Sequence, residues 1–185
     1  MKIQLIEGGV CAPKGFKANG IHCGIRKNKT KKDFALIVAE KECATACVYT
    51  TNLVKGAPIL VTKKNVANGY AQAVIVNSGN ANTCNANGVE IAEGMCKLVE
   101  KTLGIKADNV VVASTGVIGQ PLSLQPMEEG ISALAAGLGD TQAHNLSAAE
   151  AIMTTDLVAK EIAYEFEIGG KKCRIGAICK GVGML

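Results

Sequence analysis

The chain of 185 residues has no tryptophan, three phenylalanines, three tyrosines and two histidines. So few aromatic side chains leave little for bases to stack on, and we expect no nucleic-acid partner. No apolar run approaches membrane-spanning length, and residues 7–9 (Glu-Gly-Gly) interrupt the N-terminus before the apolar stretch of a secretory signal could form. We therefore expect a soluble, cytoplasmic protein with no membrane partner.

The composition is that of a globular protein, with 48% hydrophobic and 19% charged residues and a net charge of +4. A chain of this length can bury a core without disulfides, built here from Val, Ile, Leu, Ala and Cys. No repeat, low-complexity tract or proline-rich linker divides the sequence. Strands followed by helices and then a hairpin indicate a single α/β unit over residues 1–185.

Eight cysteines without a secretory signal indicate a reducing compartment, where free thiols pack as small apolar groups. Cys43, Cys47 and the His22-Cys23 pair could be imagined as a zinc site. The paired C-x-x-C spacing of such sites is missing, however. We expect no metal.

Basic residues cluster at positions 26–32 and 63–64. Such a cluster is usually a solvated loop, since charged side chains are mostly exposed. It could also form a channel for acidic small molecules. The sequence leaves both interpretations open.

The first third of the chain favours strands. Residues 34–39 and 46–50 are extended candidates, and the charged residues 40–42 between them suggest a hairpin. Residues 57–61 follow as an edge or short strand, because a proline at the start of a strand cannot donate to a ladder. Residues 73–76 form a fourth candidate strand.

Helical spacing of apolar residues predicts one helix over 89–103, stopped by Gly104, and a second over 127–138, with Pro126 in its first turn. The sequence Ser-Ala-Ala-Glu at 147–150 suggests a capping box that opens a third helix ending near Met153. Residues 162–168 and 173–177 alternate on either side of Gly-Gly, which predicts a β-hairpin.

Residues 109–119 read NVVVASTGVIG, a buried strand running into a turn with two hydroxyl residues and two glycines. The strand would hold Ser114, Thr115 and Gly116 in a fixed position at its carboxyl end. A hydroxyl and a backbone N–H side by side can stabilise a developing oxyanion. The alternative is an ordinary strand-to-loop junction.

Other polar segments allow two interpretations each. The Asn-rich residues 77–88 either line a polar pocket or only turn the chain. Thr154 belongs to a polar run at the end of the third helix. Lys180 lies where the hairpin gives way to glycines, a position usually facing solvent. The chain stops on two apolar residues, as though a longer polypeptide had been cut.

Six motifs in order resemble the N-terminal, or α, subunit of bifunctional ornithine acetyltransferase, the glutamate N-acetyltransferase of the arginine pathway. The motifs lie at residues 15–20, 51–52 with 57–58, 77–82, 114–119, 151–156 and 180–184. The resemblance runs nearly end to end. Each motif is weak by itself, but the order of all six is specific to that family.

The resemblance implies a four-layer α/β/β/α sandwich completed by a second chain, β. The two chains arise when one precursor cleaves itself before a threonine, shortly beyond Leu185, and they form a heterodimer that assembles into a heterotetramer. That threonine is the nucleophile, and its freed amine can act as the base. It takes acetyl from N-acetylornithine and passes it to glutamate in a ping-pong reaction.

The resemblance also implies residue roles. Thr115 and Gly116 match the oxyanion hole, and Thr154 and Lys180 match substrate-binding positions. No cofactor is implied. Some members of the family also accept acetyl-CoA as a co-substrate, and the sequence does not decide between the two kinds.

Two other functions fit the same residues. The Asn-rich loop and the Ser-Thr-Gly turn could form the pocket of a non-enzymatic domain that binds an amino acid or phosphate. The chain could also be a catalytically inactive scaffold subunit. Only the enzyme requires a second polypeptide that begins with threonine.

Overall fold

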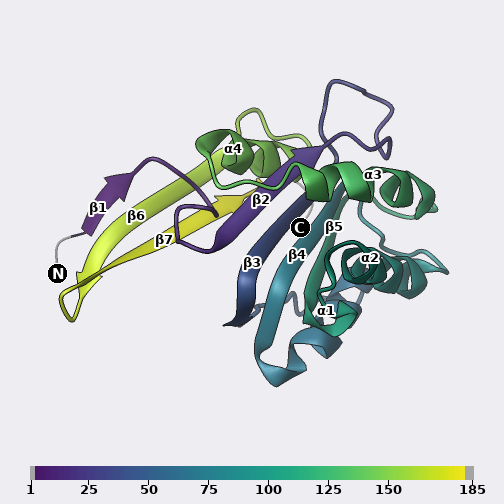
Figure 1. The fold of residues 1–185 in the computed structure, drawn as a ribbon. Helices are drawn as coiled ribbons and strands as arrows, with labels where there is room; N and C mark the ends of the chain where they lie inside the picture. The colour runs from purple at the N-terminus through teal and green to yellow at the C-terminus, as the bar shows by residue number, and fades with distance from the viewer. Residues whose placement is uncertain (1–2, 182–185) are drawn as a thin grey trace.

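The computed structural model describes residues 3–181, which form two β-sheets and four α-helices (Figure 1). The strands are β1 (Ile3–Ile6), β2 (Phe16–Ile21), β3 (Phe34–Ala44), β4 (Tyr70–Asn80), β5 (Val110–Val117), β6 (Lys160–Ile168) and β7 (Lys171–Cys179). The helices are α1 (Ala57–Asn65), α2 (Gly88–Leu103), α3 (Gln125–Ala136) and α4 (Gln142–Ala151), with 3-10 turns η1 (Val66–Asn68) and η2 (Ala107–Asn109). None of the helices in this range is long and apolar enough to cross a bilayer.

The four-stranded sheet has the order β2-β3-β4-β5, and the three-stranded sheet the order β1-β6-β7. All neighbours pair antiparallel except β4 and β5, which are parallel. A parallel pair needs a crossover connection, and α2 supplies it. The carboxyl ends of β4 and β5 therefore lie at the same edge of the sheet.

The main core lies between one face of the four-stranded sheet and helices α2 and α3 (Figure 1). Alternate residues of the central strands point to this face, because side chains alternate along a strand. The largest fully buried members of the core are Phe34, Leu36, Ile75, Met95, Met127, Leu134, Val99 and Val110.

The opposite face of the same sheet is covered only in part. Helix α4 packs closely on β2, where a Cβ on Gly20 would lie 2.1 Å from the Ser147 carbonyl oxygen. Towards β4 and β5, residues of this second face are only half-buried: Val74, Val76, Val111 and Ala113. An apolar sheet face in this state is available to a further layer.

The three-stranded sheet also has one uncovered apolar face. Residues paired directly across its strands share that face, for example Leu5, Tyr164 and Ile175. Its isoleucines and leucine are 43–63% exposed: Ile3, Leu5, Ile162, Ile168 and Ile175. The other face carries charged groups such as Glu165, which pairs with Lys172 and Arg174.

The local patterns predicted several elements correctly. The structure confirms the strands that became β4 and β5, helices α2 and α3, and the β6–β7 hairpin. Gly104, with φ of 72°, ends α2. Gly169 and Gly170 both have positive φ, as a tight hairpin turn requires.

The predicted hairpin between residues 34–39 and 46–50 is wrong. The charged residues 40–42 do not turn the chain but continue β3 at its exposed end, and a register shift between Val38 and Cys43 accommodates them. Residues 46–50 form no strand; Val48 is fully exposed and Leu53 beyond it 93% exposed. Strand β3 pairs with β2 and β4 instead.

Residues 57–61 were predicted as a strand and are helical. Pro58 lies in the first turn of α1, where its missing N–H is no loss. The helix lies along β5, the edge strand of the sheet. The Thr62 hydroxyl donates to the Val112 carbonyl (2.7 Å) and accepts from its N–H (3.0 Å). A helix side chain thus satisfies backbone groups that an edge strand would leave unpaired.

The third helix was predicted to open at Ser147, and this boundary is wrong. Helix α4 begins at Gln142, with Thr141 as N-cap and its hydroxyl 2.7 Å from His144 Nδ1. Ser147 is internal, and its hydroxyl donates to the Gly20 carbonyl (3.2 Å). A serine inside a helix can thus match the sequence pattern of an N-cap although its hydroxyl bonds to the backbone of a distant strand.

All eight cysteines are free thiols. Cys11 and Cys96 are buried, and burial raises the pKa of the Cys96 thiol to about 12. That thiol is protonated at neutral pH and packs in the main core, as the sequence predicts for an apolar use of cysteine.

We predict that Thr62→Val destabilises the protein by about 1–3 kcal/mol, because two buried backbone groups of Val112 lose their partner. Thr62→Ser, which keeps the hydroxyl, should cost less. Urea unfolding followed by far-UV circular dichroism compares the two. Equal stability of the valine variant and the wild type would contradict this account of the β5 edge.

Candidate functional site

A cavity of about 760 Å³ lies at the carboxyl ends of β4 and β5. The four residues singled out by the sequence, Thr115, Gly116, Thr154 and Lys180, all line it, although the sequence separates them by up to 65 positions. The remaining lining residues are Arg26, Gly79, Val117, Ile118, Thr155 and Gly181. The fold thus brings all four together at one site.

Two glycines meet backbone to backbone at the wall of this cavity. Gly79 on β4 pairs with Gly116 on β5, beside a register shift at Asn80. Gly116 has φ of 136°, and a Cβ there would lie 2.3 Å from the Gly79 carbonyl carbon. No other residue type fits either this conformation or this space. The strand continues to Val117, so Ser114 and Thr115 lie in its last residues rather than in a turn.

The Thr115 side chain lies on the uncovered face of the four-stranded sheet. Alternation along β5 places it with Val111 and Ala113, whereas Ser114 points to the helix-covered face. There the Ser114 hydroxyl donates to Asn77 Oδ1 (2.6 Å). The two hydroxyls therefore have different roles. The Ser114 hydroxyl links β5 to β4, and Thr115 faces the cavity.

The Asn-rich segment mainly turns the chain. Asn80 Nδ2 donates to the Gln120 carbonyl (3.0 Å), and Asn80 Oδ1 accepts from the Asn82 N–H (2.8 Å). Asn82, with φ of 48°, donates to the Gly88 carbonyl at the start of α2 (2.8 Å). Of the predicted pocket-lining segment, only Gly79 reaches the cavity.

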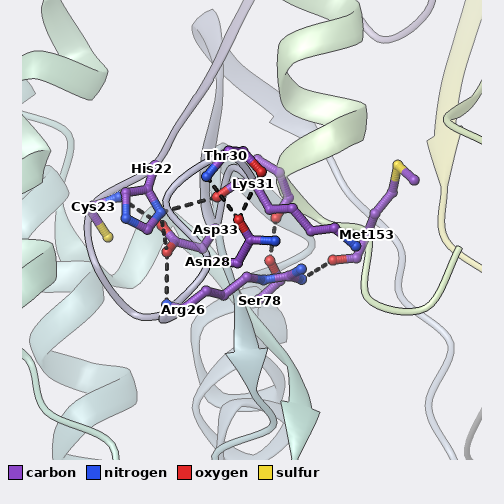
Figure 2. A network of polar contacts seen from close by, with 10 residues as sticks. His22, Cys23, Arg26, Asn28, Thr30, Lys31, Asp33, Ser78 and Met153 are labelled. Atoms are coloured by element: carbon purple, nitrogen blue, oxygen red, sulfur yellow. Dashed lines mark hydrogen bonds and ion pairs between the residues drawn. The ribbon is translucent and has the colours of Figure 1, made fainter.

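Arg26 enters the cavity from the basic loop between β2 and β3. The fully buried Asp33 carboxylate holds that loop: it accepts from the N–H groups of Cys23 (2.7 Å) and Arg26 (2.9 Å) and lies 2.9 Å from His22 Nδ1 (Figure 2). Lysines 27, 29 and 31 of the cluster are exposed. Lys32 is half-buried and pairs with Glu150 (2.9 Å). The cluster is thus mostly a solvated loop, and of its cations Arg26 alone lines the cavity.

The Arg26 guanidinium is tied to the turn that carries Thr154. It donates through Nη2 to the Met153 carbonyl (Figure 2). Its stem packs on Gly79. Its Nε is buried without a hydrogen-bond partner among the described residues. Burial lowers the pKa of the Arg26 guanidinium, and the Asp33 charge opposes that shift. A guanidinium is not deprotonated in proteins, so the group is a cation at neutral pH.

Thr154 and Lys180 reach the cavity from two segments that a single carboxylate joins. Asp156 Oδ2 accepts from the Thr154 N–H (3.1 Å), and its Oδ1 accepts from the Gly181 N–H and from Lys160 Nζ (2.7 Å). These bonds, with that of Lys160 foremost, hold the pKa of the Asp156 carboxyl well below its usual range. Residues 182–184 of the last sequence motif lie outside the described residues.

The cavity is positively charged. Neither Arg26 nor Lys180 forms an ion pair within residues 3–181, and no carboxylate lines the cavity. Two cations beside hydroxyls and a glycine-rich strand end suit a small anionic ligand. The same range contains no cluster of His, Cys, Asp or Glu that could hold a metal ion.

The sequence patterns did not single out Arg26 or Gly79 as lining residues of the cavity. Arg26 is one of only two arginines in the chain and lies among lysines, which was the one available signal. Gly79 lay within the Asn-rich segment. Its role depends on contact with Gly116, which sequence spacing does not reveal.

A second hollow of about 730 Å³ meets the cavity at Thr115, Gly116 and Ile118. It runs along β5 beneath the irregular segment between β3 and α1 and is mostly apolar. Thr115 can thus be approached from the cavity that contains Arg26 and Lys180 and from the uncovered face of the sheet.

The chain is similar to curated proteins about twice its length. It is 46% identical over 185 residues to the arginine biosynthesis bifunctional protein of Symbiobacterium thermophilum, covering 99% of this chain and 46% of that protein. It is 47% identical to the Gloeobacter violaceus protein of the same name, covering 98% and 45%. The chain spans about half the length of these relatives.

Two crystal structures match the fold over the whole chain. One is the arginine biosynthesis bifunctional protein of Bacillus halodurans, with a TM-score of 0.93, 38% identity and coverage of 100% of this chain and 96% of that one. The other is ornithine acetyltransferase of Mycobacterium tuberculosis in complex with ornithine, with a TM-score of 0.93, 34% identity and coverage of 100% and 97%. The model of the ArgJ family matches residues 17–185. The chain therefore belongs to the ArgJ family.

Proposed function

We propose that this chain is the α half of an acetyltransferase of arginine biosynthesis that moves acetyl from N-acetylornithine to glutamate. One observation carries the proposal: Thr115, Gly116, Thr154 and Lys180 come from three separate segments and line one positively charged cavity. A relative with the same fold was crystallised with ornithine. Carboxylates of such amino acids are the anions that this cavity suits.

The nucleophile in this proposal is the N-terminal threonine of a companion β chain. Its free α-amine takes the hydroxyl proton as the oxygen attacks the acetyl carbonyl. The Thr115 hydroxyl and Gly116 N–H stabilise the oxyanion that forms. The C–N bond then breaks, and ornithine leaves with a proton from the nucleophile's α-ammonium. Glutamate's amine attacks the resulting ester and gives a proton to the α-amine. The second oxyanion collapses to N-acetylglutamate, and the threonine oxygen leaves with that proton.

Two observations support a companion chain. The uncovered apolar faces of both sheets need a further layer, which a four-layer α/β/β/α sandwich would provide. Curated relatives are about twice as long as this chain, yet the crystallised chains are matched over 96–97% of their length. A precursor divided near its middle would give both lengths. The resulting heterodimer would pair into a heterotetramer.

Lys180 and Thr154 bind the amino-acid substrates in this proposal. The Lys180 ammonium holds the α-carboxylate that N-acetylornithine and glutamate share, and the Thr154 hydroxyl fixes its orientation. Arg26 adds a second positive charge to the same cavity. No cofactor takes part. Acetyl-CoA is proposed as a second acetyl donor, since the curated relatives are named bifunctional.

Intact-mass analysis of the purified product of the full precursor tests this function. We expect two co-purifying polypeptides, the second beginning with Thr, and acetyl transfer from N-acetylornithine to glutamate. A single intact polypeptide that binds amino acids without transferring acetyl would favour the non-enzymatic binding domain. Two chains without transfer would favour the inactive scaffold. Acetyl-CoA with glutamate, assayed separately, tests the second donor.

We predict that Thr115→Ala lowers kcat by about 10²–10³, the usual cost of losing one oxyanion donor. Thr115→Ser, which keeps the hydroxyl, should recover most of the rate. Steady-state rates normalised to the amount of cleaved β chain give the comparison. A Thr115→Ala enzyme with full activity would remove Thr115 from this role.

We predict that Lys180→Ala raises the KM for N-acetylornithine by about tenfold or more with little change in kcat, because a carboxylate bound alike in ground and transition states affects KM alone. Lys101→Ala, an exposed lysine on α2, is the matched control. Unchanged KM in the Lys180 variant would mean that this lysine is only a solvated surface group.

A further inference from the structure

Asp156 joins three segments of the chain behind the cavity. Its side chain is only 2% exposed. Its two oxygens accept hydrogen bonds from the backbone N–H of Thr154, the backbone N–H of Gly181 and the Lys160 ammonium. Thr154 follows α4, Lys160 begins β6, and Gly181 follows β7.

Asp156 does not itself line the cavity, whereas two of the three segments that it joins do. Thr154, Thr155, Lys180 and Gly181 are all lining residues. The Lys180 ammonium in turn donates to the Gly181 carbonyl (2.9 Å), so its position depends on the same backbone segment. A Cβ on Gly181 would lie only 2.7 Å from Asp156 Oδ1, which leaves the backbone little freedom to shift.

We propose that Asp156 is a positioning residue of the acetyltransferase: its carboxylate fixes the Thr154 and Lys180 segments relative to each other, so that both side chains reach one substrate carboxylate. A charged acceptor suits this task because it can take several N–H donors at once. The low pKa of the Asp156 carboxyl keeps it ionised throughout the neutral range. Two binding groups from different segments need such a fixed distance, because small displacements of positioning groups cost much affinity or rate.

This inference rests on the proposed function. The test uses the assembled two-chain enzyme, with rates normalised to the cleaved β chain. Normalisation matters because Gly181 lies only a few residues before the expected cleavage point. If the wild-type enzyme transfers no acetyl, the proposed function fails. If the wild type is active and the Asp156 variants bind substrate normally, only the present inference fails.

Asp156→Asn is the main variant. It keeps the shape of the side chain but sets an NH₂ group against one of the two backbone N–H donors. We expect the KM for N-acetylornithine to rise about tenfold or more, with kcat changed by less than about threefold. A fall in melting temperature with unchanged KM would mean that Asp156 only stabilises the fold, and would overturn the proposal.

A variant without the binding side chains separates positioning from general damage. In a Thr154→Ala/Lys180→Ala background, adding Asp156→Asn should raise KM by no more than about twofold, because the groups that Asp156 positions are already gone. A further rise of tenfold or more in that background would show that Asp156 acts by another route, which also overturns the proposal.

Two controls use other parts of the chain. Lys160→Met removes one hydrogen-bond donor to Asp156 but leaves both backbone N–H donors. The assay is run at pH 8, where Asp156 stays ionised even if the loss of Lys160 returns its carboxyl to an ordinary pKa of about 4. We expect the KM of the Lys160→Met enzyme to stay within about twofold of the wild-type value. An increase as large as that of Asp156→Asn would overturn the proposal. Asp108→Asn, exposed in η2, serves as a matched substitution away from the cavity.

Should Asp156→Asn prevent folding or cleavage, Asp156→Glu takes its place. Glutamate keeps the charge but moves the carboxylate by one methylene. An increased KM supports positioning by Asp156, and a KM equal to that of the wild type overturns it.

Discussion

The close approach of two backbones, at Gly79 on β4 and Gly116 on β5, is the constraint on which the site depends. A Cβ on Gly116 would overlap the Gly79 carbonyl carbon, and both glycines have positive φ. The contact exists because β4 and β5 are parallel and end at the same edge of the sheet. It fixes where Thr115 stands and leaves the cavity wall as backbone rather than side chain.

Buried acceptors and donors behind the cavity then hold the loops that complete it. Asp33 organises the loop that carries Arg26, and Asp156 joins the Thr154 turn to the end of β7. The Ser78 hydroxyl donates to the Ala151 carbonyl (2.6 Å) and so ties β4 to the end of α4. None of these three groups lines the cavity. The site is thus built from half-buried cations and hydroxyls, and buried polar groups behind it hold the segments that carry them.

The chain covers some of its apolar surface and leaves the rest to water. Helices α2 and α3 bury one face of the four-stranded sheet, but the second face near β5 and one face of the β1-β6-β7 sheet stay partly exposed. Burying apolar area yields roughly 25 cal/mol per Å², so these faces favour association. Thr115 lies on the same face as the uncovered valines of β4 and β5. In the proposed two-chain enzyme, the chain that covers this face would therefore also lie beside Thr115.

Elements whose signals lie in neighbouring residues could be predicted from the sequence. Helical periodicity before Gly104 fixed α2, and Gly169 with Gly170 fixed the β6–β7 turn. The motif around Thr115 marked the site because hydroxyl and glycine stand next to each other in the chain. The local patterns did not predict the helix at residues 57–61 along the β5 edge or the position of Arg26 beside the cavity. These outcomes depend on contacts between residues far apart in the chain, which periodicity and spacing do not encode.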